Sequence, residues 1–427
     1  MHLNTSSVSP FRLTVVNTAV SLDNPWATYP GGDPFPFTYN KANPVFAPYG
    51  SYLPVPTNMK THIEYTWNLG VQRQINPSWF AAATYLGSHI IHVWNAVELN
   101  PAEYIPGSCS AGQYGLTAPG LCTQASNVNQ RRVLNLAQPG SQLSYITQYD
   151  DGGTQSYNGL LVTSSWRMHS NINLNANYTW SHCIGIQDIG VTVLNPGANY
   201  IHGGYGQNIG PADRNLDVGN CAQDRRQIAN VTLVAVTPRF ANNAARVLGT
   251  GWTFATSFVA RAGAPFNIVT GTSPDPATGF GGNAPGTQRP NLVLTNTVSA
   301  TQGQACANVT PCVSWLNPAA FAAPALGTMG NLGYNALTGP AFWEWDEAIS
   351  RQFRIRENQR LEIRAESFNL TNHVNYNVNG TTVSSATTFG TITTDATPSS
   401  GAGAGGTSGS SANAPARVMQ FALKYVF

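Results

Sequence analysis

The chain has 427 residues, of which only 9% are charged and 42% are hydrophobic, at a mean hydropathy of −0.16. Soluble domains usually carry about 25% charged residues, so neutral polar residues take the place of ions here, as in an outer-membrane barrel or a secreted Asn/Thr-rich β-solenoid or sandwich. A net charge of +2 and only two adjacent basic pairs, Arg131-Arg132 and Arg225-Arg226, argue against nucleic acid as a partner.

Residues 1–59 are dense in proline, glycine and aromatic residues, and we predict that they form an extracellular loop region, with a possible strand end at 11–20. The first residues, Met1 to Val8, have neither the basic nor the apolar region of a signal peptide. We therefore expect a protein of this kind to be missing its front. The second predicted region, 60–427, is the C-terminal part of a β-barrel.

The most regular segment is 171–182, where apolar and polar residues alternate without a break from Ile172 to Ser181. Alternation with period 2 predicts a strand with one apolar and one polar face, and its length suits the 9–11 residues of a tilted transmembrane strand. No uninterrupted apolar run predicts a transmembrane helix. Eight further segments show the same pattern less regularly: 60–75, 78–94, 156–169, 226–239, 250–270, 341–356, 358–373 and 415–427.

The connections between these segments alternate in length. Short ones follow Ile75, Met168 and Arg356, with a medium one near 240–249, whereas about 95–155, 184–225, 271–340 and 374–414 are long. The last of these includes a low-complexity stretch at 384–413. Outer-membrane barrels have short periplasmic turns and long extracellular loops. With Phe427 in the periplasm, every short turn is predicted to be periplasmic and every long loop extracellular.

The chain ends in a strand pattern with a predicted lipid-facing side, and a barrel-assembly role is expected for that terminal strand. Its apolar residues are Met419, Phe421, Leu423, Tyr425 and Phe427. In 250–270 the outward set is Trp252, Phe254, Phe258 and Ala260. In 358–373 Leu361, Ile363 and Ala365 alternate with a charged ladder that is predicted to face the lumen, namely Glu362, Arg364 and Glu366.

Six cysteines fall into three pairs, each within or around one long loop. This spacing favours three local disulfides, formed in an oxidising compartment. Free or metal-binding cysteines are the alternative, although no C-x₂-C motif occurs. The candidate pairs are Cys109 with Cys122, Cys183 with Cys221, and Cys306 with Cys312.

Catalytic and metal-binding motifs are weak, and we expect no enzyme activity, cofactor or metal. His89 and His92 would point to opposite sides of a strand, and Asp150-Asp151 is an acidic turn that could hold Ca²⁺ but is more simply a solvated turn. A stretch with mixed charges is read as an ion-paired loop: Asp213, Arg214, Asp217, Asp224, Arg225 and Arg226. Glu344 and Asp346 would share the lumen face, with Trp343 and Trp345 outward in an interfacial girdle.

Several phrases resemble one group of proteins: Trp67 to Ile75, Asn317 to Phe321, Gly330 to Asn335, Arg364 to His373 and the ending Arg417 to Phe427. Together they resemble the Oar-like TonB-dependent transporter family, in the C-terminal half of its barrel domain. The resemblance implies an antiparallel transmembrane β-barrel of 22 strands, of which this chain supplies about 9–10. It also implies a signal peptide, a regulatory-like domain and a plug, which we expect to be absent from this fragment.

The leading hypothesis is an all-β, Gram-negative outer-membrane transporter barrel, whose full-length form takes up an unidentified ligand. Its expected partners are outer-membrane lipid, the barrel-assembly machinery and, through the missing N-terminal part only, the TonB system; nucleic acid is not among them. A non-transporting adhesin or scaffold that binds partners through disulfide-clamped loops is the rival reading. A secreted glycan-binding or hydrolytic β protein is a third.

Overall fold

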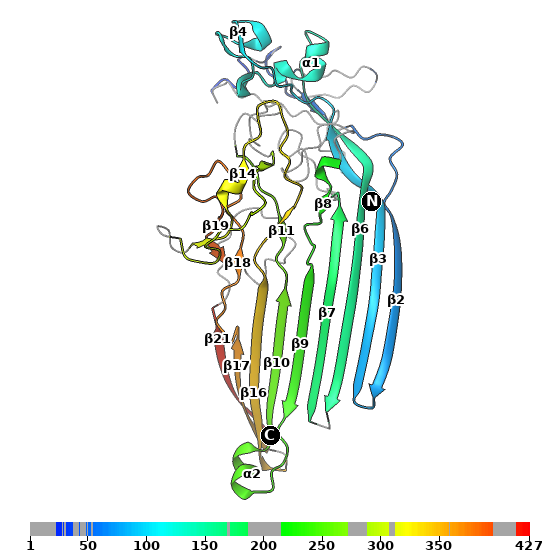
Figure 1. Ribbon diagram of the computed structural model, residues 1–427, viewed down its shortest axis with the longest axis vertical. Helices are drawn as coiled ribbons and strands as arrows, with labels where there is room; N and C mark the ends of the chain where they lie inside the picture. Colours follow the sequence, from blue (N-terminus) through cyan, green and yellow to red (C-terminus); the bar gives the residue numbers. More distant parts are fainter. Residues whose placement is uncertain are drawn as a thin grey trace.

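The structure is a computed structural model that describes residues 23–27, 29, 31–36, 42, 48, 50–52, 54–168, 171–186, 215–271, 288–306, 312–357, 359–395 and 416–427. Long antiparallel strands dominate it (Figure 1), which confirms the all-β fold predicted from the sequence. The nine predicted segments are all strands: β2 (Ile63–Asn76), β3 (Trp79–Glu98), β6 (Leu143–Met168), β7 (Ile172–Gly185), β9 (Gln227–Val236), β10 (Trp252–Arg261), β16 (Phe342–Arg356), β17 (Gln359–Phe368) and β21 (Val418–Val426).

These strands form one sheet in which spatial order follows sequence order, from β2 at one edge to β21 at the other. The short turns and the C-terminus lie at one end of the sheet, and α1 (Val133–Ala137) lies beyond the other end (Figure 1). The short strands β1 (Gly50–Tyr52) and β8 (Gly219–Asn220) pair at that loop end with β6 and β7. An up-and-down meander of this kind matches the predicted alternation of short turns and long loops.

Cross-strand register sorts the side chains onto two faces. One row pairs Leu69 with Tyr85, Tyr85 with Leu160 and Leu160 with Trp180. A row three residues along contains Gln72, Ala82, Thr163, Asn177 and Asn230. Because paired residues point to the same side, the strands from β2 to β9 have one apolar face and one polar face.

The apolar face is largely uncovered. Leu69 is 72% exposed, Phe421 77% and Leu423 71%. The main buried apolar cluster lies instead among the loops, in Ile268, Leu316, Ala320, Phe321, Leu332 and Phe389. A soluble sheet would bury such a face in its own core, since exposed apolar area costs about 25 cal/mol per Å². A lipid environment removes that cost.

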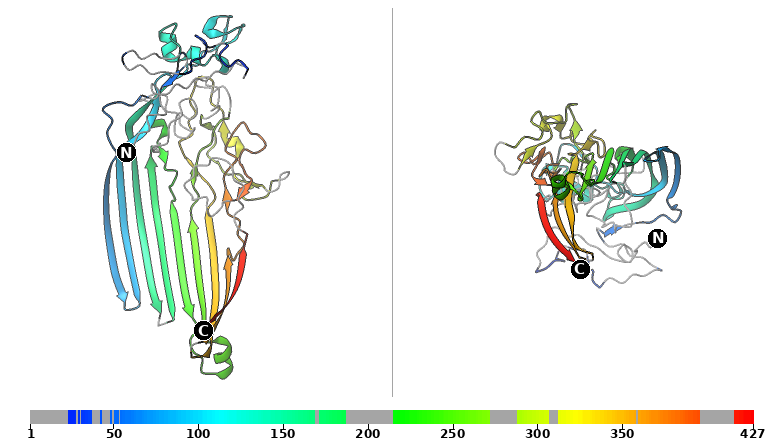
Figure 2. Two further views of the ribbon diagram at one scale, coloured as in Figure 1. Left: turned by 180° about the vertical axis from the view of Figure 1, so that it is seen from behind. Right: turned by 90° about the horizontal axis from the view of Figure 1, so that it is seen from below.

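The two edges of the sheet are open. In the part of the chain that the structure describes, β2 pairs only with β3 and β21 only with β17. Viewed from below, the strands trace an arc that does not close on itself (Figure 2). Unpaired backbone groups are not tolerated in lipid, so the arc needs further strands at both edges to complete a barrel.

The loop after β3 differs from its prediction. β3 continues to Glu98 and β6 starts at Leu143, so much of the predicted loop 95–155 is a strand pair that extends beyond the other strands. Asp150 and Asp151 accordingly lie within β6 rather than in a turn. Register shifts at Ile91/Val93 and Val93/Asn95 interrupt the alternation there, because a bulge adds an unpaired residue to one strand.

The remaining loops contain short pairs and helices. The pairs are β4 (Ser108–Cys109) with β5 (Gly120–Leu121), β11 (Pro265–Phe266) with β15 (Leu337–Thr338), β12 (Asn291–Leu292) with β14 (Phe321–Ala322), β13 (Val313–Ser314) with β19 (Thr391–Ile392), and β18 (Tyr376–Asn377) with β20 (Thr394–Asp395). A helix, α2 (Asn243–Gly249), occupies the β9–β10 turn. The predicted strand end at 11–20, most of the low-complexity stretch, Asp213 and Arg214 lie outside the described residues.

Candidate functional site

Aromatic residues lie at two levels of the apolar face. Near the short turns are Trp79, Trp166, Trp252, Phe353 and Tyr425, and toward the loops are Tyr65, Trp67, Trp180, Trp343 and Trp345. From Trp343 to Phe353 a strand at about 3.3 Å per residue extends about 33 Å, or about 25 Å of thickness at a tilt of about 40°. This matches the apolar band and aromatic girdles of an outer-membrane barrel, so the polar face is the lumen side.

The terminal strand belongs to this apolar face. Its residues Phe421, Leu423 and Tyr425 stand directly opposite Ala365, Ile363 and Leu361 of β17. Met419 stands opposite Ser367, and Phe427, which is 90% exposed, follows the strand. In β10, Trp252, Phe254, Phe258 and Ala260 share the same face. The terminal strand β21 thus presents an apolar side to lipid and has an open edge beside it.

On the polar face of β2 to β9, neutral polar side chains bond to one another across the strands. The Ser165 hydroxyl donates to Asn175 Oδ1 at 2.8 Å, and Asn230 Nδ2 donates to Asn177 Oδ1 at 2.8 Å. The strict Asn alternation of 171–182 therefore forms cross-strand hydrogen bonds along the lumen face. We call this surface the neutral wall.

The polar face of β10 to β21 is charged, and we call it the charged wall. Arg364 forms an ion pair with Glu366, and Gln352 Nε2 donates to Glu362 Oε2 at 3.3 Å. Register places Lys424 opposite Glu362. The structure therefore places the ladder Glu362, Arg364 and Glu366 on the face opposite the terminal strand's apolar residues, where opposite charges can pair across strands.

At the loop end of the charged wall, Glu344 and Asp346 share the polar face, whereas Trp343 and Trp345 lie on the apolar face. Asp346 Oδ1 accepts a hydrogen bond from the backbone of Asn369 at 2.9 Å. The Arg261 guanidinium lies 4.2 Å from the centroid of the Phe342 ring. Two carboxylates and the Arg261 guanidinium thus lie near one another at the loop end of the polar face.

The six cysteines form three disulfides: Cys109–Cys122, Cys183–Cys221 and Cys306–Cys312. Each closes a segment at the loop end of the sheet. The Cys183–Cys221 bridge ties the end of β7 to the segment before β9, where the Cys183 N–H also donates to Asp224 Oδ1 at 2.8 Å. These bonds require an oxidising compartment.

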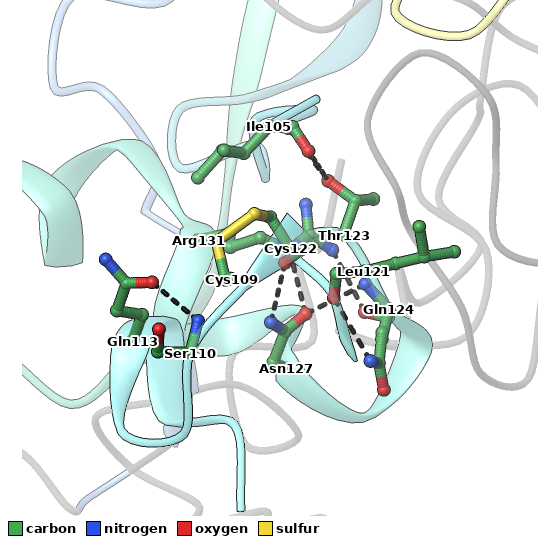
Figure 3. The surroundings of a disulfide bond; sticks show 10 residues. All are labelled: Ile105, Cys109, Ser110, Gln113, Leu121, Cys122, Thr123, Gln124, Asn127 and Arg131. Atoms are coloured by element: carbon green, nitrogen blue, oxygen red, sulfur yellow. Dashed lines mark hydrogen bonds between the residues drawn. A yellow bond between two sulfur atoms is a disulfide. The ribbon is translucent and has the colours of Figure 1, made fainter. Parts of the chain in front are cut away.

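The Cys109–Cys122 disulfide lies in a compact cap built by side chain to backbone hydrogen bonds (Figure 3). Asn127 Nδ2 donates to the Cys122 carbonyl at 2.8 Å, and its Oδ1 accepts from Arg131 Nε at 2.9 Å. Burial and the neighbouring Arg132 lower the pKa of Arg131 to about 10. Both arginines are fully buried, so this adjacent basic pair belongs to the interior of the cap.

A buried ion pair joins two long loops. Arg289 Nη1 lies 2.8 Å from Asp217 Oδ1, and both side chains are almost completely buried. Arg289 Nε also donates to the Leu332 carbonyl at 2.9 Å. Asn220 and Asn335 exchange side-chain amide to backbone carbonyl hydrogen bonds, each at 2.8 Å. We call these four residues the loop clamp.

Sequence reasoning missed the clamp's partners. The sequence predicted that the loop around Asp217 is ion-paired within itself. Among the described residues, the contact of Asp224 with Arg226, at 4.0 Å, fits that prediction. The partner of Asp217 comes instead from another loop. The sequence held one signal for the clamp, the segment Gly330 to Asn335, which was noted above for its family resemblance. The Leu332 carbonyl and the amide and carbonyl of Asn335 in this segment form hydrogen bonds of the clamp.

The histidine pair is held apart. His89 Nδ1 lies 2.8 Å from Ser156 Oγ, whereas His92, with a φ of 58°, lies 3.8 Å from the Asp151 carboxylate. Simple alternation, on which the sequence argument rested, does not hold here because of the bulge. No group of three potential metal ligands occurs among the described residues. Every helix in the described ranges is too short or too polar to cross a bilayer.

The lumen face offers neutral hydrogen-bonding groups and paired charges, with rigid caps at the loop end. This arrangement can line a hydrated passage and present a fixed outer surface to a ligand or partner.

Comparison with known proteins gives an independent result. Residues 2–420 match the family described as outer membrane beta barrel domain. No curated protein matches. Among solved structures, the chain is similar to the outer membrane transporter YddB from Escherichia coli, with 11% identity and a TM-score of 0.36, over 82% of this chain and 33% of that one. The chain thus spans about a third of that transporter's length.

Proposed function

The chain belongs to the outer membrane beta barrel domain family, and we propose that it is part of an Oar-like TonB-dependent transporter that takes up a ligand across the outer membrane. The family membership and the two-faced sheet establish an outer-membrane protein. The finer assignment is supported by the resemblance of the phrases from Trp67 to Phe427. The proposal assigns the chain no catalytic reaction, cofactor or metal.

The observation that carries the proposal is the open arc with a continuous polar face. Nine long strands that do not close imply a barrel larger than these strands alone, and large barrels enclose a lumen instead of a packed core. A transporter of the proposed kind uses such a lumen, with a plug and a TonB contact supplied by further polypeptide. The terminal strand, from Met419 to Phe427, is proposed to contact the barrel-assembly machinery.

The test uses the full-length protein purified from outer membranes. Its binding to the isolated periplasmic domain of TonB is measured by calorimetry, with and without the plug segment that the proposal requires. Saturable binding that depends on this segment is the expected result. Absence of binding, in a sample whose electrophoretic mobility still shifts on heating, would refute TonB dependence while leaving the barrel intact.

A non-transporting adhesin or scaffold is the second candidate, because the three disulfides and the buried Arg131 stiffen the outer surface. Deletion of the cap between Pro101 and Ser141 distinguishes an adhesin from a transporter. An adhesin loses surface attachment with this deletion, whereas a transporter retains TonB binding and loses ligand uptake at most.

A further inference from the structure

The β9–β10 connection differs from the other short turns because it contains α2 (Asn243–Gly249). The Asn242 side chain caps its first turn by accepting from the backbone N–H groups of Ala244 and Ala245, at 2.9 and 3.3 Å. The helix lies beyond the strand ends, beside the C-terminus, at the short-turn end of the sheet (Figure 1). It is therefore at the periplasmic boundary of the membrane.

Two side chains of the apolar face bind the last carbonyls of this helix. Trp252 Nε1 donates to the Leu248 carbonyl at 2.7 Å, and Arg351 Nη1 donates to the same oxygen at 3.0 Å. Arg351 Nη2 also donates to the Val247 carbonyl. The Arg351 guanidinium lies 4.6 Å from the Phe353 ring centroid and 5.4 Å from that of Trp252. The lipid-facing surface thus extends directly into α2.

The helix and the segment before it expose apolar side chains. Val247 is 65% exposed, Leu248 72% and Phe240 38%. Arg239 and Arg246 are exposed beside them, and neither has an acidic partner among the described residues. Apolar and basic residues together on a short helix are the pattern of an interfacial anchor, in which apolar groups enter the acyl boundary and basic groups contact anionic headgroups.

We propose that residues 239–248 form a membrane-surface anchor that binds anionic phospholipid in the periplasmic leaflet. Val247 and Leu248 enter the boundary between headgroups and acyl chains, and Arg239 and Arg246 bind the phosphates. Lipid is the occupant because the helix continues the lipid-facing surface through Trp252 and Arg351 and because its charge is complementary to anionic headgroups. The anchor does not depend on transport, so it stands or falls separately from the proposed function.

The test places a nitroxide label at Leu248→Cys in the full-length protein, in vesicles of phosphatidylcholine with and without phosphatidylglycerol. Collision rates with oxygen and with a water-soluble nickel complex report its depth. Glu357→Cys, exposed in the neighbouring β16–β17 turn, is the matched control. The expected ratio of oxygen to nickel collisions is about threefold or more higher at 248 than at 357, because a label in the acyl boundary meets oxygen more often than the polar complex.

The anionic part is tested by adding Arg239→Gln and Arg246→Gln to the Leu248→Cys protein. Phosphatidylglycerol should deepen the label in the parent and have no such effect in the double variant, since each arginine adds up to about fivefold in affinity for an anionic surface. Equal aqueous exposure at 248 and 357 in both vesicles would overturn the proposal. So would a label that is shielded only in native envelopes, which would indicate a periplasmic protein instead.

Discussion

The neutral wall and the charged wall are built on the same strand geometry but differ in how they present polar groups to the lumen. The neutral wall bonds amide to amide, as between Asn177 and Asn230. The charged wall pairs ions, as between Arg364 and Glu366. Neutral amides leave a surface whose interactions are nearly independent of salt, whereas ion pairs respond to ionic strength and to charged solutes. The charged wall is therefore sensitive to salt and to charged solutes, whereas the neutral wall is not.

The loop clamp joins the two walls, because Asp217 follows strands of the neutral wall and Arg289 precedes β16 of the charged wall. Asp217→Asn leaves the Arg289 guanidinium buried without its anion, which typically costs about 3–5 kcal/mol. We expect residues 288–340 to lose protection in hydrogen exchange while the strands keep theirs. The double variant D217L/R289M should recover most of the protection; equal loss in single and double variants would contradict the buried-charge explanation.

Placing a charge on each face of the strands β2 to β9 tests the assignment of the neutral wall to the lumen. Val162→Arg puts a guanidinium on the apolar face near mid-membrane and is expected to destabilise the barrel by about 2–4 kcal/mol. Thr163→Arg, one residue on, points to the polar face, where an arginine stays hydrated and should change stability by less than about 1 kcal/mol. Urea unfolding in bilayers measures both. Similar losses of unfolding free energy for the two variants would contradict the assignment of the two faces.

The two walls should respond differently to salt. Arg364→Gln removes an ion pair whose arginine is half exposed, so we expect a loss of about 0.5–1 kcal/mol that disappears in high salt. Asn177→Ala removes the amide hydrogen bond of the neutral wall, for about 0.5–1.5 kcal/mol with no salt dependence. Unfolding at low and high ionic strength makes the comparison. A salt-independent loss for Arg364→Gln would mean that its charge does not matter.

The smallest expected effect concerns pH at the loop end of the charged wall. His373 stacks on Trp343 with ring centroids 4.2 Å apart, and burial lowers its pKa from 6.5. A lowered pKa means that the folded protein resists protonation of His373. The contribution of neutral His373 to folding stability is therefore complete above pH 6.5 and declines as pH falls below it. His373→Phe keeps the stacking and should remove this component of the pH dependence of unfolding. An unchanged pH profile would assign the dependence to other groups.

The strands and their faces could be read from single segments. In 171–182 the side chain of each residue is directed by the strand's own period of 2, so alternation reveals both the element and its two faces. The pairing of cysteines within one loop was predictable for a similar reason, since close positions in sequence are close in space. The bulge near His92 was not predictable, because it arises from a register shift against β6.

The sequence by itself determined an outer-membrane β-barrel with one lipid face, one lumen face and loops at one end, because period, length and composition are local properties. Only the tertiary structure decided that Arg131 and Arg132 are buried in a cap, that Arg289 joins Asp217, and that Arg351 reaches α2. Each of these contacts joins residues far apart in the chain or depends on the packing of a folded loop. Such choices depend on three-dimensional proximity and desolvation, which the order of residues along the chain does not display.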